Sequence, residues 1–218
     1  MSHQVKICCI KSIEEGLLAI DFGATAIGLV GPMPSGPGVI SLQTIRDIAS
    51  GMPDDVNAFL LTSEVEAEHI IAQHRITDTS SIQLVDQLSI VELRKLKSAL
   101  RKIDVVQVIH VQDEPSIIQA TAIAPYVDAL LLDSGNPQLE IKELGGTGRA
   151  HNWDISQQIV EEVEVPVYLA GGIGADNVVQ AIKHVRPFGV DLCSSVRTND
   201  VLDKEKLTAF FEAVSTLV

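Results

Sequence analysis

Short apolar runs alternate with amphipathic segments along the whole chain. Such runs, rich in Val, Ile and Leu, are typical of strands buried on both faces of a parallel sheet. The predicted strands are Val5–Ile10, Ala26–Val30, Asn57–Leu61, Ser81–Leu84, Asp104–Val111, Ala129–Leu132, Val165–Leu169 and Gly189–Cys193. The predicted helices are Ser12–Phe22, Ser41–Met52, Glu64–Gln73, Ser89–Lys102, Pro115–Ala124, a segment capped by Asn152 or Asp154 and ending at Glu162, Asp176–Val185 and Lys204–Leu217.

Local signals support several of these helices. Ser12 and Glu15 have the spacing of a capping box, and Gly23 provides a stop after the first helix. Leu93 and Leu96 recur at helical spacing and predict one apolar face. Pro115 stands at a first helical turn, where its missing N–H costs nothing.

The order of the elements favours one fold. Eight strand–helix pairs in 218 residues is about the minimum for a TIM barrel. No break in composition suggests a linker, so we predict a single (β/α)8 TIM-barrel domain over residues 1–218. A doubly wound sheet is the alternative, but its glycine-rich phosphate turn comes early in the chain, whereas the glycine-rich turns here come late.

Composition narrows the possible partners. The chain is 46% hydrophobic and only 4% aromatic, which predicts an aliphatic core. Its net charge of −13 is spread along the chain without a basic patch, so nucleic acid is not an expected partner. No apolar run is long enough for a membrane span and no signal peptide is evident, so we expect a soluble cytoplasmic protein. Three cysteines form no disulfide framework, and no spacing suggests zinc, so neither metal nor cofactor is expected.

Candidate anion-binding groups follow the late strands. Barrel enzymes place their sites at the C-terminal strand ends, with phosphate usually held after strands seven and eight. Three consecutive late loops are rich in Gly or Ser, and their backbone N–H groups can form an anion site beside a helix N-terminus. The predicted phosphate-binding residues are Gly145, Gly146, Gly148, Gly171, Gly172, Cys193 and Ser194. The alternative is that these glycines serve only tight turns.

Two further strand ends carry reactive side chains. The sixth strand ends at Asp133, and the first ends at Cys8 and Cys9. Because side chains alternate along a strand, we expect one of the two thiols to face the barrel mouth and the other to pack against the helices. A thiol and a carboxylic acid facing each other across a phosphate-anchored sugar suit an acid–base isomerisation. A structural role for a buried cysteine is the alternative.

These residues occur in motifs that resemble a known family over essentially the whole chain. In order, the motifs are Lys6-Ile7-Cys8, Gly23-Ala24, Ile27-Gly28, Gln83-Leu84, Leu130-Leu131-Leu132-Asp133, Gly145-Gly146-Thr147-Gly148, Trp153, Leu169-Ala170-Gly171-Gly172, Asn177-Val178 and Val190-Asp191. They resemble those of phosphoribosylanthranilate isomerase, an enzyme of tryptophan biosynthesis. The correctly spaced pair of GGTG and LAGG is the most specific part of the resemblance.

The resemblance implies an Amadori rearrangement, in which a phosphoribosylated arylamine passes from aldose to ketose. It assigns Cys8 as the base that removes the C2′ proton and Asp133 as the acid that protonates the furanose oxygen. Such an acid must be protonated at working pH, so we expect the apolar strand end to raise the pKa of Asp133. The substrate would be a small phosphorylated sugar, and the protein a monomer or homodimer.

The chain also departs from the family pattern. Cys9 replaces the glycine of KICG, and the loop that carries SPR in the family reads SGPG here, with no arginine between Gly28 and Arg46. QLHG has become QLVD, and SSGVE aligns with CSSVR, residues 193–197. We therefore expect an intact phosphate end and a changed aryl end, with Arg46, Arg149 or Arg197 as possible replacements for the lost arginine.

Two other functions remain open at this point. One is an isomerase, lyase or transferase that acts on another sugar phosphate through a changed aglycone pocket. The other is a non-catalytic barrel that binds a phosphorylated metabolite or a partner protein. Retention of both Cys8 and Asp133 disfavours the non-catalytic barrel, because such a protein has no need of a paired acid and base.

Overall fold

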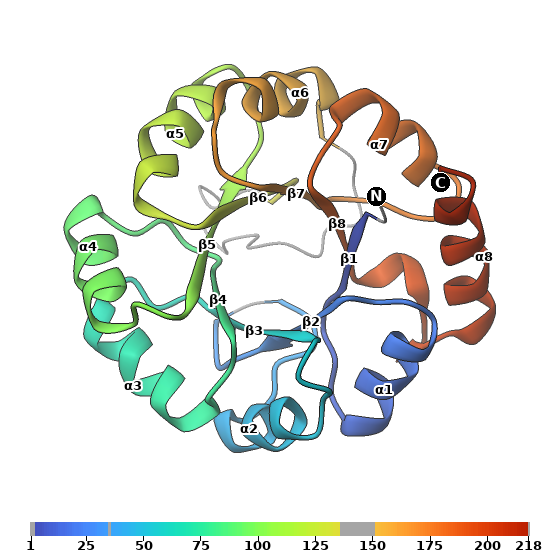
Figure 1. Cartoon of the computed structure of the whole chain (residues 1–218), viewed down its shortest axis with the longest axis horizontal. Helices are drawn as coiled ribbons and strands as arrows, with labels where there is room; N and C mark the ends of the chain where they lie inside the picture. The colour runs from blue at the N-terminus through green and yellow to red at the C-terminus, as the bar shows by residue number, and fades with distance from the viewer. Residues whose placement is uncertain (1–2, 35, 136–150, 218) are drawn as a thin grey trace.

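The computed structural model describes residues 3–34, 36–135 and 151–217, and it shows a closed barrel of eight parallel strands surrounded by helices (Figure 1). The strands are β1 (Gln4–Ile7), β2 (Ala26–Val30), β3 (Asn57–Thr62), β4 (Ser81–Leu84), β5 (Asp104–His110), β6 (Ala129–Asp133), β7 (Val167–Leu169) and β8 (Gly189–Leu192). The helices are α1 (Ile13–Asp21), α2 (Leu42–Ser50), α3 (Ala67–Thr77), α4 (Ile90–Ala99), α5 (Pro115–Ile123), α6 (Trp153–Glu162), α7 (Val178–Val185) and α8 (Lys204–Ser215). The predicted (β/α)8 fold is confirmed.

The strands separate two apolar layers. Outward-facing side chains such as Ile7, Leu60 and Leu130 are fully buried against the helices and form the larger core. Inward-facing side chains fill the barrel, where the rings of Phe59 and Tyr168 meet edge to face at 6.2 Å. Each fully buried aliphatic or aromatic side chain contributes about 1.5–3 kcal/mol. The filled interior leaves room for a ligand only beyond the strand ends.

The barrel closes where β1 pairs with β8, and this closure brings together residues far apart in sequence. Lys6 is the register partner of Asp191, and Ile7 is that of Leu192. Inward-facing residues of the first and last strands therefore lie side by side. The C-terminal ends of these two strands meet at the same edge of the barrel.

Helix starts follow the predicted caps in part. The Ser12 hydroxyl accepts a hydrogen bond from the Glu15 N–H at 3.2 Å, as expected of a capping box. The Glu15 carboxylate, however, accepts from the Lys11 N–H at 2.9 Å and pairs with Arg197 at 2.8 Å. The reciprocal half of the predicted box is replaced by a contact with the last βα loop.

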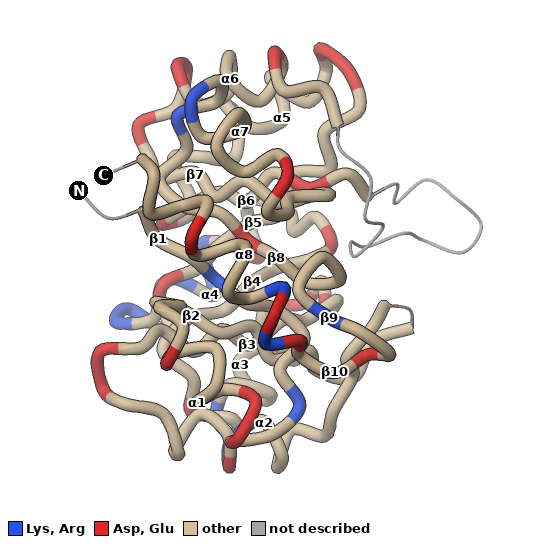
Figure 2. The backbone as a smooth tube through the Cα atoms, turned by 90° about the vertical axis from the view of Figure 1, so that its right-hand side faces the viewer, with Lys and Arg blue, Asp and Glu red and all other residues tan. Residues whose placement is uncertain are grey.

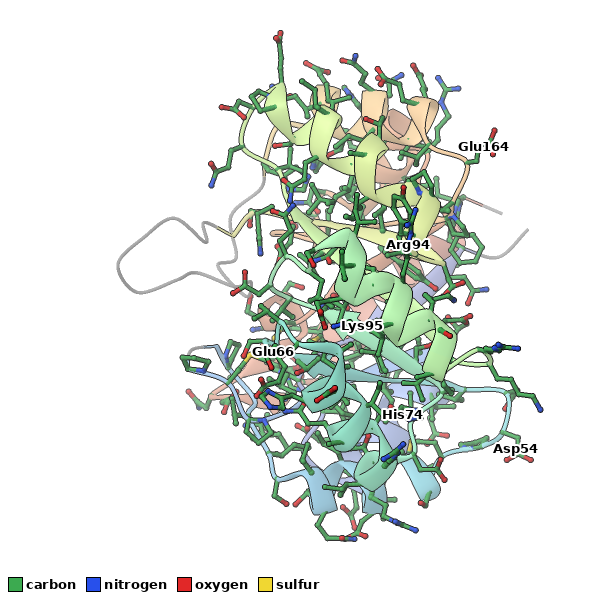
Figure 3. The ribbon with its side chains drawn as sticks, turned by 90° about the vertical axis from the view of Figure 1, so that its left-hand side faces the viewer. Asp54, Glu66, His74, Arg94, Lys95 and Glu164 are labelled. Carbon is green, nitrogen blue, oxygen red and sulfur yellow. The ribbon has the colours of Figure 1, made fainter. Side chains whose placement is uncertain are left out.

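One helix is displaced from its predicted position. The segment predicted as Glu64–Gln73 forms α3 only from Ala67, because the Glu92 carboxylate of α4 accepts a hydrogen bond from the Ala67 N–H at 2.8 Å. Lys95 of α4 pairs with Glu92 at 2.7 Å and lies near Glu66, just before α3 (Figure 3). A contact with a neighbouring helix, which local sequence does not encode, thus sets the start of α3.

A short hairpin after β8 was not predicted. Its strands are β9 (Arg197–Thr198) and β10 (Val201–Leu202), and they pair antiparallel. Asn199 and Asp200 between them both have positive φ, as a two-residue hairpin turn of the primed type requires. The Asn-Asp pair was the available sequence signal.

Charged residues are distributed over the outer helices and loops (Figure 2). Acidic positions occur on every side of the tube in this view. Among the helices described, none is long and apolar enough to cross a membrane.

Candidate active site

A pocket lies at the C-terminal ends of the strands. The empty space in it, including the part open to solvent, is about 710 Å3, within the range of small-molecule sites. Its lining comes from the ends of β1, β2, β3, β4, β6, β7 and β8. The lining residues are Cys8, Cys9, Val30, Met33, Gly36, Pro37, Leu61, Gln83, Val85, Asp133, Ala170, Gly171, Gly172, Ile173, Asp191, Leu192, Cys193, Ser194 and Ser195. The structure thus brings both sequence-predicted catalytic residues, Cys8 and Asp133, into one pocket.

Cys8 lies deep in the barrel mouth beside a buried cation. A Cβ atom on Gly28 would lie 2.8 Å from the Cys8 Sγ and 3.0 Å from the Lys6 Nζ, so thiol and ammonium are separated by no more than the sum of these distances. The missing side chain at Gly28 therefore makes room for both groups. Lys6 itself is fully buried, bonds to Asp191 Oδ1 at 2.8 Å and lies over the Phe59 ring.

The charges in this cluster favour the Cys8 thiolate. The pKa of Cys8 lies below its ordinary value, chiefly because the Cys9 thiol hydrogen-bonds to it. Burial opposes this effect, and the charge of Lys6 adds to it. Lys6 keeps its charge despite burial, because Asp191 raises the pKa of Lys6 above the ordinary value. The geometry is that of a buried base with a neighbouring cation.

The expectation that Cys8 and Cys9 point opposite ways is wrong. Both side chains line the pocket. The regular strand ends at Ile7, and Cys9 has a φ of +63°, in the left-handed region, so strand alternation no longer applies there. A glycine adopts this conformation without strain, which explains why KICG is compatible with the same turn.

Asp133 is held at the end of β6. Its Oδ1 accepts a hydrogen bond from the Ser134 N–H at 2.7 Å, and the residue is buried. His151 lies in the same region, with its Nε2 at 2.7 Å from the Ser156 hydroxyl. Burial lowers the pKa of His151 to about 4, although the charge of Asp133 opposes the shift, so this imidazole is neutral at pH 7.

The Gly171–Gly172 turn after β7 brings its backbone close to neighbouring side chains. Gly171 and Gly172 have φ values of +76° and +68°, which favour glycine. A Cβ on Gly171 would lie 3.0 Å from both His151 Nδ1 and Ser134 Oγ. The turn is fixed from behind by the Asn177 side-chain amide, which donates to the Gly172 carbonyl at 2.8 Å.

Only some of the predicted phosphate-binding residues lie in the part of the chain that the structure describes. Gly171, Gly172, Cys193 and Ser194 line the same pocket, at the ends of the neighbouring strands β7 and β8. Gly145, Gly146 and Gly148 lie outside the described residues, as does Arg149.

Two polar side chains in the pocket were not singled out from sequence as site residues. Gln83 Oε1 and Ser195 Oγ are buried and have no hydrogen-bond partner among the described residues. Both residues line the pocket, so each offers an unsatisfied polar atom to a ligand. Gln83 could have been found from strand alternation, because it lies two residues before Val85, which faces inward.

The β2–β4 side of the pocket carries one polar side chain, Gln83, and is otherwise apolar. It is lined by Met33, Pro37, Leu61 and Val85, and the lining supplied by the described residues includes no Lys or Arg. A carboxylate on this side would therefore meet no cation from the described chain.

Two of the three candidate arginines are committed elsewhere. Arg46 reaches from α2 to the Ile76 carbonyl at 3.5 Å and is exposed on the outside of the barrel. Arg197 is buried, where it donates to the Cys9 carbonyl at 2.6 Å and pairs with Glu15. It holds the end of β1 against the last βα loop and does not line the pocket.

Comparisons with known proteins agree with this geometry. The profile of the family described as N-(5′-phosphoribosyl)anthranilate (PRA) isomerase matches residues 5–213. N-(5′-phosphoribosyl)anthranilate isomerase 2 of Methanosarcina mazei is 34% identical over 95% of this chain and 92% of its own length. N-(5′-phosphoribosyl)anthranilate isomerase of Haloferax volcanii is 32% identical over 98% of this chain and 93% of its own length.

Solved structures give the same result. Phosphoribosyl anthranilate isomerase from Thermotoga maritima matches with a TM-score of 0.85 and 26% identity, over 98% of this chain and 99% of its own. A phosphoribosyl anthranilate isomerase in complex with reduced 1-(o-carboxyphenylamino)-1-deoxyribulose 5-phosphate matches with a TM-score of 0.82 and 25% identity, over 98% and 99%.

Proposed function

Because the chain belongs to the N-(5′-phosphoribosyl)anthranilate isomerase family, we propose that it catalyses the Amadori rearrangement of a phosphoribosylated arylamine in the cytoplasm, as a step of tryptophan biosynthesis. The observation that carries this proposal is the position of Cys8 and Asp133 in one pocket with the Gly171–Gly172 turn. A thiol base, a carboxylic acid and an anion-binding turn are the groups that this reaction needs.

Asp133 is the proposed general acid. In the first step it donates a proton to the furanose ring oxygen, and the ring opens to a Schiff base. Its place at the end of β6, anchored by the Ser134 N–H, keeps the carboxyl at the barrel mouth. Burial raises the pKa of the second carboxylate in the pocket, Asp191, but its Oδ1 accepts a hydrogen bond from the Lys6 ammonium, and a proton on Asp191 would break up this buried ion pair.

Cys8 is the proposed general base. In the second step its thiolate removes the C2′ proton, giving an enolamine that becomes the ketone. The buried charge of Lys6 and the Cys9 thiol favour the thiolate, and both therefore support this role. A positioned base or acid contributes about 10²- to 10⁴-fold to a rate.

The substrate phosphate is proposed to bind at the ends of β7 and β8. Gly171, Gly172, Cys193 and Ser194 would supply backbone donors, together with Gly145, Gly146 and Gly148. Ser195, whose hydroxyl is unsatisfied among the described residues, is suited to the same anion. Each charge-assisted contact is worth roughly 1.5–3 kcal/mol, so the phosphate is the main anchor of the substrate.

The aglycone then extends toward the β2–β4 side. Met33, Pro37 and Val85 provide an apolar surface for an aryl ring. The loop that carries the family's arginine supplies none here, so the aryl carboxylate is the weakly held end of the substrate.

Turnover of phosphoribosylanthranilate, followed as loss of substrate fluorescence, tests the function. Cys8→Ala and Asp133→Asn should each lower kcat by about 10²- to 10⁴-fold. Asp54→Asn, at an exposed position between α2 and β3, is the matched control and should leave kcat unchanged. Wild-type protein that fails to turn over a saturating concentration of substrate would refute the proposal.

A further inference from the structure

All three cysteines of the chain line one pocket, and two of them are in contact. The Sγ atoms of Cys9 and Cys193 lie 2.7 Å apart, although 184 positions separate the residues in sequence. All three thiols are free in this structure. The contact joins the ends of β1 and β8, the two strands that close the barrel.

The backbone aims the Cys9 thiol at this contact. The positive φ of Cys9 turns its side chain away from the helices and into the pocket. Its other neighbours enclose it, because a Cβ on Gly38 would lie 2.6 Å from the Cys9 Cβ and the Pro37 carbonyl is 3.6 Å from the Sγ. A thiol in a strained conformation, enclosed on its loop side and touching a second thiol, is positioned to react with it.

We propose that Cys9 and Cys193 form a reversible disulfide that switches the proposed isomerase off under oxidising conditions. Cys193 is the more accessible of the two and is reached through the pocket. Its thiolate attacks a small-molecule disulfide such as oxidised glutathione and forms a mixed disulfide, which releases one thiol. Cys9 then attacks the Cys193 sulfur and the second thiol leaves with the Cys9 proton. Two electrons and two protons thus pass to the small disulfide.

The new bond would disturb the proposed phosphate site and the proposed base. A disulfide requires an S–S distance of about 2.0 Å, so the end of β1 and the Cys193 turn, where the phosphate is proposed to bind, are drawn together. The bond also consumes the Cys9 thiol, which hydrogen-bonds to Cys8 and favours its thiolate. Loss of activity on oxidation therefore rests on the proposed function, whereas formation of the disulfide does not.

A bond between Cys8 and Cys9 is the competing outcome. The Cα atoms of adjacent residues lie 3.8 Å apart across a trans peptide, which is shorter than the usual 4.4–6.8 Å of a disulfide. Geometry therefore favours the bond from Cys9 to Cys193.

The test exposes the reduced full chain to glutathione buffers of increasing oxidation, followed by thiol counting and peptide mapping. Three free thiols should fall to one, and tryptic peptides 7–11 and 184–197 should be joined. Turnover should fall at least about tenfold in parallel and return with dithiothreitol. Three free thiols that persist in the most oxidising buffer would refute the disulfide.

Two variants identify the partner. Cys9→Gly fits the positive φ, and Cys193→Ser keeps the size of the side chain; each should abolish the cross-link. Cys193→Ser lacks the attacking thiol, so its activity should be the same in oxidising and reducing buffer. Cys9→Gly should stop at the mixed disulfide of Cys193 with glutathione, which no second thiol displaces. A cross-link that persists in Cys9→Gly would assign the bond to Cys8 and overturn the proposal. A cross-link that forms in protein without isomerase activity would refute the proposed function and leave the disulfide standing.

Discussion

The two ends of the pocket differ in how they are built. At the β7–β8 end, consecutive glycines with positive φ and an adjacent serine turn offer backbone and hydroxyl donors, which are held from behind by Asn177. At the β2–β4 end, the lining is apolar apart from Gln83, with no cation supplied by the described residues. The first end is suited to a compact anion, and the second to a ring without strong charge.

This difference shows which part of the site the reaction constrains. In the proposed function, phosphate binding and proton transfer depend on fixed backbone turns and on Cys8 and Asp133, and these residues stand in the motifs that resemble the family. The aryl carboxylate exchanges no proton in the proposed reaction, so its contacts can change without loss of the chemistry. We therefore expect this chain to differ from its relatives mainly at the aglycone end.

The largest effect should come from returning a cation to the aglycone end. Pro37→Arg places a guanidinium on an exposed loop position that lines the pocket. A bidentate partner for a carboxylate is worth about 2–5 kcal/mol, so kcat/KM for phosphoribosylanthranilate should rise by about 30- to several-thousand-fold.

Two variants serve as controls: one removes the proline without adding a charge, and the other places the arginine at the neighbouring position. Pro37→Gln has no charge and should give no such gain. Gly38→Arg should fail or destabilise the loop, because a Cβ there would lie 2.6 Å from the Cys9 Cβ and φ is +77°. An equal gain with Pro37→Gln would show that the loop's flexibility, not its charge, limits turnover.

The next largest effect should come from the phosphate end. Gly171→Ala places a methyl group 3.0 Å from His151 Nδ1 and Ser134 Oγ at a φ of +76°, so the turn must shift. Loss of one charge-assisted contact predicts about 10- to 150-fold weaker binding of inorganic phosphate, measured by calorimetry. Gly36→Ala, also at positive φ but on the other side of the pocket, should leave phosphate binding unchanged. Equal losses in both variants would mean that the two ends are not distinct.

A smaller effect should come from Lys6, the buried cation beside Cys8. Lys6→Met removes the charge that lowers the pKa of Cys8, so the acid limb of the kcat/KM profile should move to higher pH, because the base must be deprotonated to act. Lys6→Arg keeps the positive charge, so its acid limb should lie at a pH closer to that of the wild type. An acid limb at the same pH in Lys6→Met and the wild type would show that Lys6 does not favour the Cys8 thiolate.

The same substitution should also lower stability. Breaking a buried ion pair costs about 3–5 kcal/mol in the free energy of unfolding, measured with urea. Lys97→Met, which breaks the partly exposed pair with Asp128, should cost about 0–1 kcal/mol.

The smallest effect should come from Arg46. Its guanidinium lies on the outside of the barrel against the Ile76 carbonyl, so Arg46→Gln should change kcat/KM by less than about twofold. A tenfold loss would show that Arg46 reaches the substrate after all, and the aglycone end would then have its cation.

Much of this picture could be predicted from the sequence. The barrel follows from eight apolar runs with amphipathic segments between them, and β2 and β4 have the predicted bounds. Cys8 and Asp133 could be placed in one pocket because strand ends of a closed barrel meet at one edge.

Other features could not be predicted, because they depend on contacts between distant residues. Cys9 was expected to follow strand alternation, but the strand ends two residues earlier and a left-handed turn redirects the thiol. Arg197 was a candidate for the aryl carboxylate, yet it is bound to Glu15, a residue 182 positions away whose local signal was a helix cap. No local pattern encodes either outcome.

The most direct test of the contrast between the two ends compares two substrates on the wild-type protein. One is phosphoribosylanthranilate and the other is the same compound without its carboxylate, phosphoribosylaniline. Because the described residues supply no cation at the aglycone end, kcat/KM for the two should agree within about tenfold, or 1.4 kcal/mol. A preference of about 10³-fold or more for the carboxylate-bearing substrate would contradict the account, because it would require a bidentate cationic partner at that end.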